Sequence, residues 1–265
     1  METPWRKGRI SYDRPRIMGI LNVTPDSFSD GGDHYGSASE HAFRMIDEGA
    51  DMIDIGGEST RPGFTPVSAE EEIRRIMPVL LELAGSADVP VSVDTRKTEV
   101  AEAAIDAGAD IINDVYGLRA DGMMDLIASS GVAAVIMHMH GDMTTLHSET
   151  MEGDAVAQVI DFLKERKAAA ADAGIREDRI ILDPGVGFGK SQAQNVSIVE
   201  SAGRFSLGCP VLIGASRKRF LRTQLPGMSA DEATVEMSLR AVRAGANILR
   251  VHNVAAVRDA LEKHL

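Results

Sequence analysis

Short apolar runs alternate with longer amphipathic stretches along almost the whole chain. The apolar runs are continuous in Val, Ile and Leu, which is typical of strands that are buried on both faces of a parallel sheet. We predict eight such strands, at Ile17–Leu21, Met52–Ile55, Val89–Val93, Asp110–Asn113, Val132–Met137, Ile180–Asp183, Val211–Ile213 and Ile248–Val251.

The stretches between these strands carry apolar residues at helical spacing. Ser68-Ala69-Glu70-Glu71 matches a capping box at the start of one of them. Glycines stand where several helices should end, at Gly49, Gly108, Gly131, Gly174 and Gly245. We predict helices over Ser39–Glu48, Ala69–Leu83, Lys97–Ala107, Met123–Ser130, Asp154–Ala173, Asn195–Ala202, Ala230–Ala244 and Ala255–His264.

One six-residue unit occurs three times, over Gly49–Asp54, Gly108–Asn113 and Gly245–Arg250. Each copy consists of a helix stop, a tight turn and a strand that ends in a polar residue. Eight strand–helix units in roughly 250 residues favour a closed (β/α)8 barrel, the TIM barrel of the α/β class. We find no linker, so we predict a single domain over residues 1–265, with residues 1–15 as an N-terminal extension.

The charge balance limits the classes of partner. The chain has 28 Lys and Arg against 40 Asp and Glu, a net charge of −12, which argues against nucleic acid or an anionic membrane as a partner. An anionic small substrate would need a local basic cluster. Cys209 is the single cysteine, and no signal-like or membrane-spanning apolar stretch occurs, so we expect a cytoplasmic protein.

Polar residues follow the predicted strands. In a TIM barrel, the C-terminal strand ends and the loops after them form the active site. Seven of the eight strands end this way, which is more than helix capping explains. The residues are Asn22, Asp54, Asp94, Asn113, Asp114, His138, Asp183, Ser216-Arg217-Lys218, Arg250 and His252. We therefore expect a polar pocket with carboxylates and cations at one barrel mouth.

Two further motifs are incomplete. Gly187–Ser191 resembles the end of a phosphate-binding loop, but the first glycine of that motif would fall on Pro184. His138 and His140 lie on one side of an extended segment, as metal ligands would, yet no further His or Cys set completes a zinc site. We interpret His138 as a structural or substrate-positioning residue.

Taken together, the strand-end segments resemble those of the dihydropteroate synthases, which are pterin-binding TIM barrels. The resemblance spans residues 17 to 254 and is most specific in its first two segments. The matching segments are Met18–Gly32, Asp54–Gly63, Ser92–Thr95, Ile112–Val115, Met137–Met139, Asp183–Lys190, Gly214–Lys218 and Arg250–Asn253. The resemblance implies an enzyme that joins 6-hydroxymethyl-7,8-dihydropterin diphosphate to 4-aminobenzoate and releases diphosphate.

The resemblance also implies a pterin subsite made of Asp94, Asn113, Met137, Asp183 and Lys218. Asp183 would accept hydrogen bonds from the guanidine-like edge of the pterin, and Lys218 would donate to its carbonyl. Asn113 can both donate and accept. Asp94 would stabilise the cation that forms if the carbon–oxygen bond breaks before the amine attacks.

For the diphosphate group of the substrate, the resemblance implies a binding site made of Asn22, Arg61, Arg250 and His252, with Mg²⁺ bound to Asn22. Arg61 would join Asp94 and Lys218 as a catalytic residue. The loops Thr24–Gly36 and Ser59–Pro66 would act as lids.

Sulfonamides would compete for the 4-aminobenzoate site. That site would consist of Phe28, Thr60, Pro62, Phe188 and Ser216. A homodimer through outer helices is implied as well.

The sequence departs from the family pattern at two places. Asn253 stands where an Asp often follows the His, which bears on the positioning of His252, and Gly141-Asp142-Met143 lacks a common Pro. Three alternatives stay open: a sister synthase that uses another arylamine in a methanopterin-type pathway, a pterin-dependent methyltransferase, and a non-catalytic folate-binding barrel. The last two have no use for a diphosphate-binding cluster.

Overall fold

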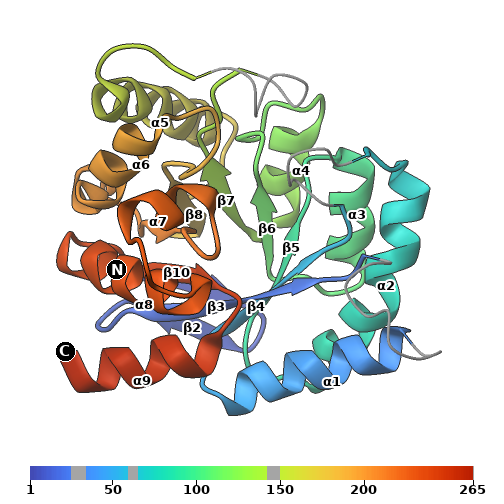
Figure 1. Cartoon of the computed structure of the whole chain (residues 1–265). Helices are drawn as coiled ribbons and strands as arrows, with labels where there is room; N and C mark the ends of the chain where they lie inside the picture. The colour runs from blue at the N-terminus through green and yellow to red at the C-terminus, as the bar shows by residue number, and fades with distance from the viewer. Residues whose placement is uncertain (25–33, 59–64, 142–149, 265) are drawn as a thin grey trace.

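The computed structural model describes residues 1–24, 34–58, 65–141 and 150–264. All eight predicted strands form, and neighbouring strands are parallel in the order β8-β7-β6-β5-β4-β3-β10-β9. A parallel bridge between Leu182 and Val211 joins the two edges, so the sheet closes into a barrel (Figure 1). The strands are β3 Arg16–Asn22, β4 Met52–Gly56, β5 Val91–Asp94, β6 Ile111–Asp114, β7 Ala133–Met137, β8 Ile180–Asp183, β9 Leu212–Ile213 and β10 Ile248–Val251.

Helices surround this barrel (Figure 1). The eight predicted helices are confirmed with shifted ends, and the predicted cap is present, because the Ser68 side chain accepts from the Glu71 amide at 3.2 Å. The short helix α7 was not predicted. The helices are α1 His34–Asp47, α2 Ala69–Ser86, α3 Thr98–Asp106, α4 Met123–Ser130, α5 Ala155–Asp172, α6 Gln192–Val199, α7 Arg219–Gln224, α8 Ala230–Arg243 and α9 Val254–His264.

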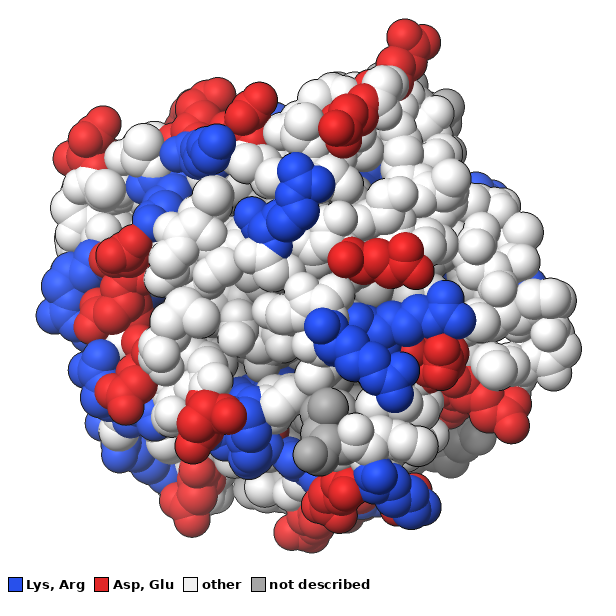
Figure 2. Space-filling model, turned by 90° about the vertical axis from the view of Figure 1, so that its left-hand side faces the viewer, with Lys and Arg blue, Asp and Glu red and all other residues white. Residues whose placement is uncertain are grey.

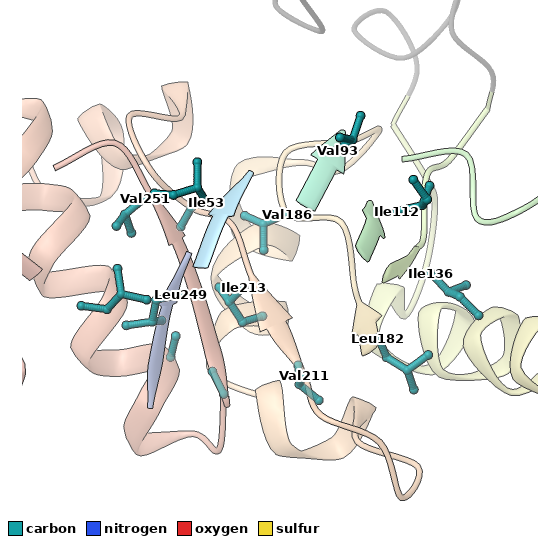
Figure 3. Close-up of a cluster of buried hydrophobic side chains, with 14 of the residues drawn as sticks. Ile53, Val93, Ile112, Ile136, Leu182, Val186, Val211, Ile213, Leu249 and Val251 are labelled. Atoms are coloured by element: carbon teal, nitrogen blue, oxygen red, sulfur yellow. The ribbon is translucent and has the colours of Figure 1, made fainter. Parts of the chain in front are cut away.

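Successive residues of each strand point alternately to the helices and to the barrel interior, as the pleat of a strand requires. The outward side chains pack under the helices in one large apolar cluster; Figure 3 shows Ile53, Val93 and Ile112 among them. The inward side chains, such as Met52, Ile111 and Ile181, form a second cluster that fills the interior of the barrel toward its N-terminal end. Burial on both sides explains the unbroken apolar runs in the sequence.

A hairpin closes the N-terminal end of the barrel. Strands β1 Glu2–Trp5 and β2 Gly8–Ser11 pair antiparallel, and Ile10 and Tyr12 join the apolar cluster of the barrel interior. The Arg6 guanidinium binds the buried Asp110 carboxylate at 2.8 Å. The apolar pattern predicts no strand in residues 1–15, so this hairpin was missed. In the part of the chain described, no helix is long and apolar enough to cross a membrane.

Candidate active site

The strand register brings polar residues from different strands into common layers at the C-terminal mouth. Asn22 is the register partner of Gly56, Gly56 of Asp94, and Asp94 of Asn113. Because residues at equal height on neighbouring parallel strands point the same way, these three side chains face the barrel interior together. A Cβ at Gly56 would lie 3.8 Å from Asn22 Oδ1, so glycine there leaves room between Asn22 and Asp94.

Arg250 connects two carboxylates at the base of this mouth. Its Nε donates to Asp54 Oδ2 at 2.6 Å, and its Nη2 donates to Asp94 Oδ2 at 2.7 Å. Asn113 Nδ2 also donates to Asp54 Oδ2, at 2.9 Å. Asp54 is fully buried, and its second oxygen has no hydrogen-bond partner among the described residues. The cluster therefore holds two carboxylates and one guanidinium, which leaves an excess of negative charge.

This imbalance affects proton affinity. Burial raises the pKa of Asp94 to about 7; the charge of Arg250 opposes this shift, and the nearby Asp54 adds to it. Burial acts to lower the pKa of Arg250, but Asp54 and Asp94 overcome this and raise it. One cation cannot fully compensate two carboxylates in a poorly solvated site, so Asp94 holds its proton more strongly than an exposed Asp does.

Asp183 and Lys218 form the next part of the mouth. Asp183 is 6% exposed, and its Oδ1 accepts from the Gly185 amide at 2.7 Å. Burial raises its pKa. The Lys218 ammonium donates to the Val186 carbonyl and lies 4.5 Å from the centre of the Phe188 ring. Burial lowers the pKa of Lys218 to about 8, against the pull of Asp183. A carboxylate and an ammonium thus stand on the same side of the mouth.

An apolar group lies beside these charges. Met137 is 3% exposed and packs in one cluster with Val115 and Met139, and the Phe188 ring packs against that cluster. Met137 is also the register partner of Asp183. The mouth therefore offers a flat, apolar surface next to donors and acceptors, which suits a planar heteroaromatic ligand.

Ser216 and His252 lie together at the mouth. The Ser216 hydroxyl is 2.9 Å from His252 Nδ1 and accepts from the His252 amide at 3.2 Å. The predicted residues Phe28, Thr60, Arg61 and Pro62 lie outside the described residues. The structure thus brings together the described members of the predicted site, and the role assigned to each of them stays a prediction.

Asn253, the departure from the family pattern, has a local explanation. Its Oδ1 accepts from the Ala256 amide at the start of α9, and its Nδ2 donates to Asp231 Oδ2 at 3.0 Å. Asp231 also binds Arg217, at 2.7 Å. An amide can serve both contacts, whereas an aspartate would face the Asp231 carboxylate. The Asn253 side chain thus completes a local network beside His252.

The predicted magnesium ligand fits only one kind of metal site. Within the described residues, no group of three His, Cys, Asp or Glu side chains could hold an ion. Asn22 offers one amide oxygen at the mouth, and Mg²⁺ commonly takes few protein ligands together with substrate phosphates and water. The residues present therefore fit an ion that binds with a diphosphate, and they do not form a cage of their own.

Sequence reasoning missed two residues that organise the mouth. Asp54 was noted as a strand-end residue without a role, yet it anchors both Arg250 and Asn113. Lys190 was noted in an incomplete phosphate-binding motif and in the matching segment Asp183–Lys190, without a role, and its ammonium contacts His138 Nδ1 at 2.8 Å. The register of β4 could have placed Asp54 in the interior. No sequence signal indicates the Lys190 contact, because the two residues are 52 positions apart.

Comparisons with known proteins agree on one family. The sequence profile of the family described as "Pterin binding enzyme" matches residues 18–252. The dihydropteroate synthase of Streptococcus pyogenes serotype M6 is 45% identical over 92% of this chain and 92% of its own length. A probable bifunctional folylpolyglutamate synthase/dihydropteroate synthase of Haloferax volcanii is 46% identical over 97% of this chain, which spans only 31% of that protein.

Solved structures are similar as well. A Xanthomonas albilineans dihydropteroate synthase with 4-aminobenzoic acid has a TM-score of 0.90 and 48% identity, covering 96% of this chain and 93% of that one. A Yersinia pestis dihydropteroate synthase with a sulfonamide drug has a TM-score of 0.92 and 38% identity, covering 99% of this chain and 98% of that one. Both similarities extend over almost the entire chain.

Proposed function

This chain belongs to the pterin binding enzymes, among their dihydropteroate synthases, and from this premise we propose how its residues divide the reaction. The reaction joins 6-hydroxymethyl-7,8-dihydropterin diphosphate to 4-aminobenzoate. The carbon–oxygen bond to the diphosphate breaks, and its electron pair leaves with the diphosphate. The amine lone pair forms the new carbon–nitrogen bond, and the amine then loses a proton to solvent.

The pterin binds between Asn113, Asp183 and Lys218, with Met137 against its ring. The observation that carries this proposal is the convergence of buried Asp183 and Asn113 with half-buried Asp94 and Lys218 at one barrel mouth. Asp183 accepts from the ring's amino and imino donors, a charge-assisted contact. Lys218 donates to the pterin carbonyl. To do so, its ammonium gives up its hydrogen bond to the Val186 carbonyl.

Asp94 and Arg250 act where charge develops. As the carbon–oxygen bond breaks, the pterin methylene becomes positive, and Asp94 in its ionised form, which predominates above about pH 7, stabilises it. Arg250 faces Asp54 and Asp94 already, so a diphosphate competes with these carboxylates for its guanidinium. Arg61 and His252 complete the anion site. Asn22 would hold Mg²⁺, which neutralises charge on the leaving group.

The 4-aminobenzoate binds against Phe188 and Ser216, with Phe28, Thr60 and Pro62 from the two loops as further contacts. Its aromatic amine is neutral at pH 7, so no strong general base is needed for the attack. The Phe188 ring at the mouth supports this placement, since it lies between the apolar cluster of Met137 and the ammonium of Lys218.

The buried Cys209 accords with a cytoplasmic location.

We assign a second copy of the chain as the partner of the α8–α9 face. An open hollow of about 400 Å³ lies there, and Met228 is 47% exposed. The lining of this hollow combines apolar and ionisable side chains: Met228, Val235, Leu239, Ala256, Asp231, Glu232, Glu236 and His264. Figure 2 looks onto the left-hand side of Figure 1 and shows stretches of uncharged surface between charged side chains. Val235→Glu should convert a dimer into a monomer in light scattering after size exclusion. An unchanged mass would contradict this assignment.

The decisive assay measures diphosphate release from pterin diphosphate and 4-aminobenzoate, with and without Mg²⁺. We expect release only with both substrates and a strong dependence on Mg²⁺. Turnover with another arylamine but not with 4-aminobenzoate would instead indicate the sister synthase. Pterin binding without diphosphate release in the presence of any arylamine would indicate a binding barrel.

A further inference from the structure

A buried ammonium lies behind the turn that carries Phe188. Lys190 is 7% exposed, and its Nζ donates to the carbonyl oxygens of Gly185 at 2.8 Å and Phe188 at 3.0 Å. Its third contact is His138 Nδ1 at 2.8 Å. Burial lowers the pKa of Lys190 to about 7, against the pull of Asp183. In its protonated form the group has three donors and no acceptor, so each donor has one partner and His138 accepts. Burial and the Lys190 charge lower the pKa of His138, which keeps its imidazole neutral.

The turn that Lys190 holds is intrinsically adaptable. Phe188 donates its amide to the Gly185 carbonyl at 3.2 Å, which closes the turn. Gly185 and Gly187 have φ values of +69° and +86°. A glycine backbone loses much conformational freedom on ordering, so a turn of this composition needs external contacts to keep one shape. Lys190 supplies them to both ends of the turn.

The same contacts join two loops. Lys190 belongs to the segment after β8, whereas His138 follows β7. The backbones touch here, because a Cβ at Gly185 would lie 1.8 Å from the His138 carbonyl oxygen. The ammonium therefore fixes the Phe188 turn against a neighbouring strand end as well as within itself.

We propose that Lys190 is a positioning residue for the 4-aminobenzoate side of the reaction. Its ammonium holds the turn of residues 185–188 so that the Phe188 ring stands at the mouth before the acceptor arrives, and it contacts neither substrate. This inference rests on the acceptor role proposed for Phe188. Without the ammonium, Phe188 O and His138 Nδ1 lose their buried donor and Gly185 O keeps only the Phe188 amide, so the turn rearranges to satisfy these groups.

The effect should be selective, because Asp183 has independent support. The His138 amide donates to the Asp183 carbonyl at 2.9 Å, and Asp183 pairs with Met137 in the β7–β8 ladder. These backbone contacts do not involve the Lys190 side chain. The Asp183 carboxylate also accepts from the Gly185 amide, but Gly185 is the first residue of the turn and its backbone lies against that of His138. A displaced turn therefore moves the Phe188 ring more than it moves the pterin-binding carboxylate.

The test compares Lys190→Met with a matched control, Lys167→Met. The Lys167 ammonium also binds a backbone carbonyl, that of Leu207, and an acid, Glu177, but in loops at the opposite end of the barrel. For Lys190→Met we expect the KM for the arylamine acceptor to rise about tenfold or more, with a change below about threefold in the KM for pterin diphosphate. Lys167→Met should leave both KM values unchanged, whatever its effect on Tm.

A double variant separates this inference from the role of Phe188. If Lys190 acts through Phe188, Lys190→Met should raise the KM for the arylamine acceptor no further in a Phe188→Ala background. No effect of Phe188→Ala by itself would refute the acceptor role of Phe188. With that role intact, equal rises in both KM values, or no rise at all, would overturn the Lys190 proposal. Should Lys190→Met fail to fold, Lys190→Gln, which keeps two N–H donors on its side-chain amide, is judged by the same comparison of the two KM values.

Discussion

The two ends of the barrel use buried charge in opposite ways. At the N-terminal end, Asp110 accepts four hydrogen bonds, three from Arg6 and one from the Val91 amide, so a single carboxylate is fully satisfied. At the C-terminal mouth, Arg250 serves both Asp54 and Asp94, and one Asp54 oxygen has no partner in the described residues. The satisfied end stabilises the fold, and the unsatisfied end is poised for a ligand.

The hairpin explains why the N-terminal end needs no ligand. Its apolar residues Ile10 and Tyr12 complete the interior cluster, and Tyr12 donates to Thr3 at 3.0 Å. At the mouth, in contrast, burial raises the pKa of Asp94 and of Asp183, which is a cost to the folded protein. Such a cost is typical of sites where function constrains the side chains.

The largest expected effect on stability comes from the N-terminal end. Asp110→Ala leaves Arg6 and the Val91 amide without their acceptor. Because the Arg6 side chain is 36% exposed and can be hydrated, we expect the free energy of unfolding to fall by about 2–3 kcal/mol. Because Asp110 is far from the mouth, kcat/KM of the folded variant should stay unchanged. Urea denaturation and steady-state kinetics measure the two quantities. Glu2→Ala, which breaks an exposed ion pair with Arg9, is the control and should cost about 1 kcal/mol or less.

At the mouth, Arg250→Ala should act mainly on the leaving group. We expect the affinity for pterin diphosphate to fall at least about tenfold more than the affinity for the diphosphate-free pterin, since only the former uses the charge-assisted contact. Calorimetric titration with both ligands measures the difference. Equal losses would mean that Arg250 serves only to compensate Asp54 and Asp94.

The raised pKa of Asp94 predicts a pH dependence. Between pH 4 and about pH 7 the folded protein keeps a proton on Asp94 that the unfolded chain has lost, so this group reduces stability as the pH rises. Asp94→Asn removes that contribution. Relative to the unaltered protein, the variant should gain up to about 1.4 kcal/mol per pH unit in this window and nothing further above it. Urea denaturation from pH 4.5 to 8.5 tests this; a constant difference would contradict the raised pKa.

The smallest effect concerns the departure at Asn253. Asn253→Asp keeps the acceptor for the Ala256 amide but places a second carboxylate beside Asp231. Arg217 also binds Asp231 and offsets part of the repulsion. We expect a loss of less than about 1 kcal/mol in stability and a change of a few-fold in the KM for pterin diphosphate. A fall of a hundredfold in kcat would mean that Asn253 takes part directly in the chemistry.

The sequence was sufficient for the barrel because its strands are buried on both faces. Each of the eight strands contains an apolar run, and the glycines predicted to end helices have positive φ. The hairpin was missed because Glu2–Trp5 and Gly8–Ser11 contain no apolar run and are ordered only by packing on the barrel. Helix α7 was missed for a similar reason, since its six residues contain only one apolar pair, Phe220 and Leu221, which is too short to establish a period.

For the site, the sequence identified strand-end residues but not their partners. Asp94 and Asn113 could be placed together, since they end neighbouring strands. The contact of Arg250 with Asp54 spans 196 positions and depends on closure of the barrel, so no local pattern reveals it. Contacts of the ammonium of Lys190 are hidden for the same reason. Local patterns therefore predicted where the mouth lies, and the tertiary structure determined how its charges pair.

We propose that the charged residues of the mouth serve ligand recognition and not stability. The most direct test is Asp183→Asn, with pterin titrated calorimetrically and urea denaturation measured on the same preparation. We predict a loss of about 2 kcal/mol or more in pterin affinity, the scale of a charge-assisted hydrogen bond, with the free energy of unfolding unchanged or higher. Unaltered pterin affinity in the folded variant, or a loss of stability as large as that of Asp110→Ala, would contradict this division of roles between the two ends.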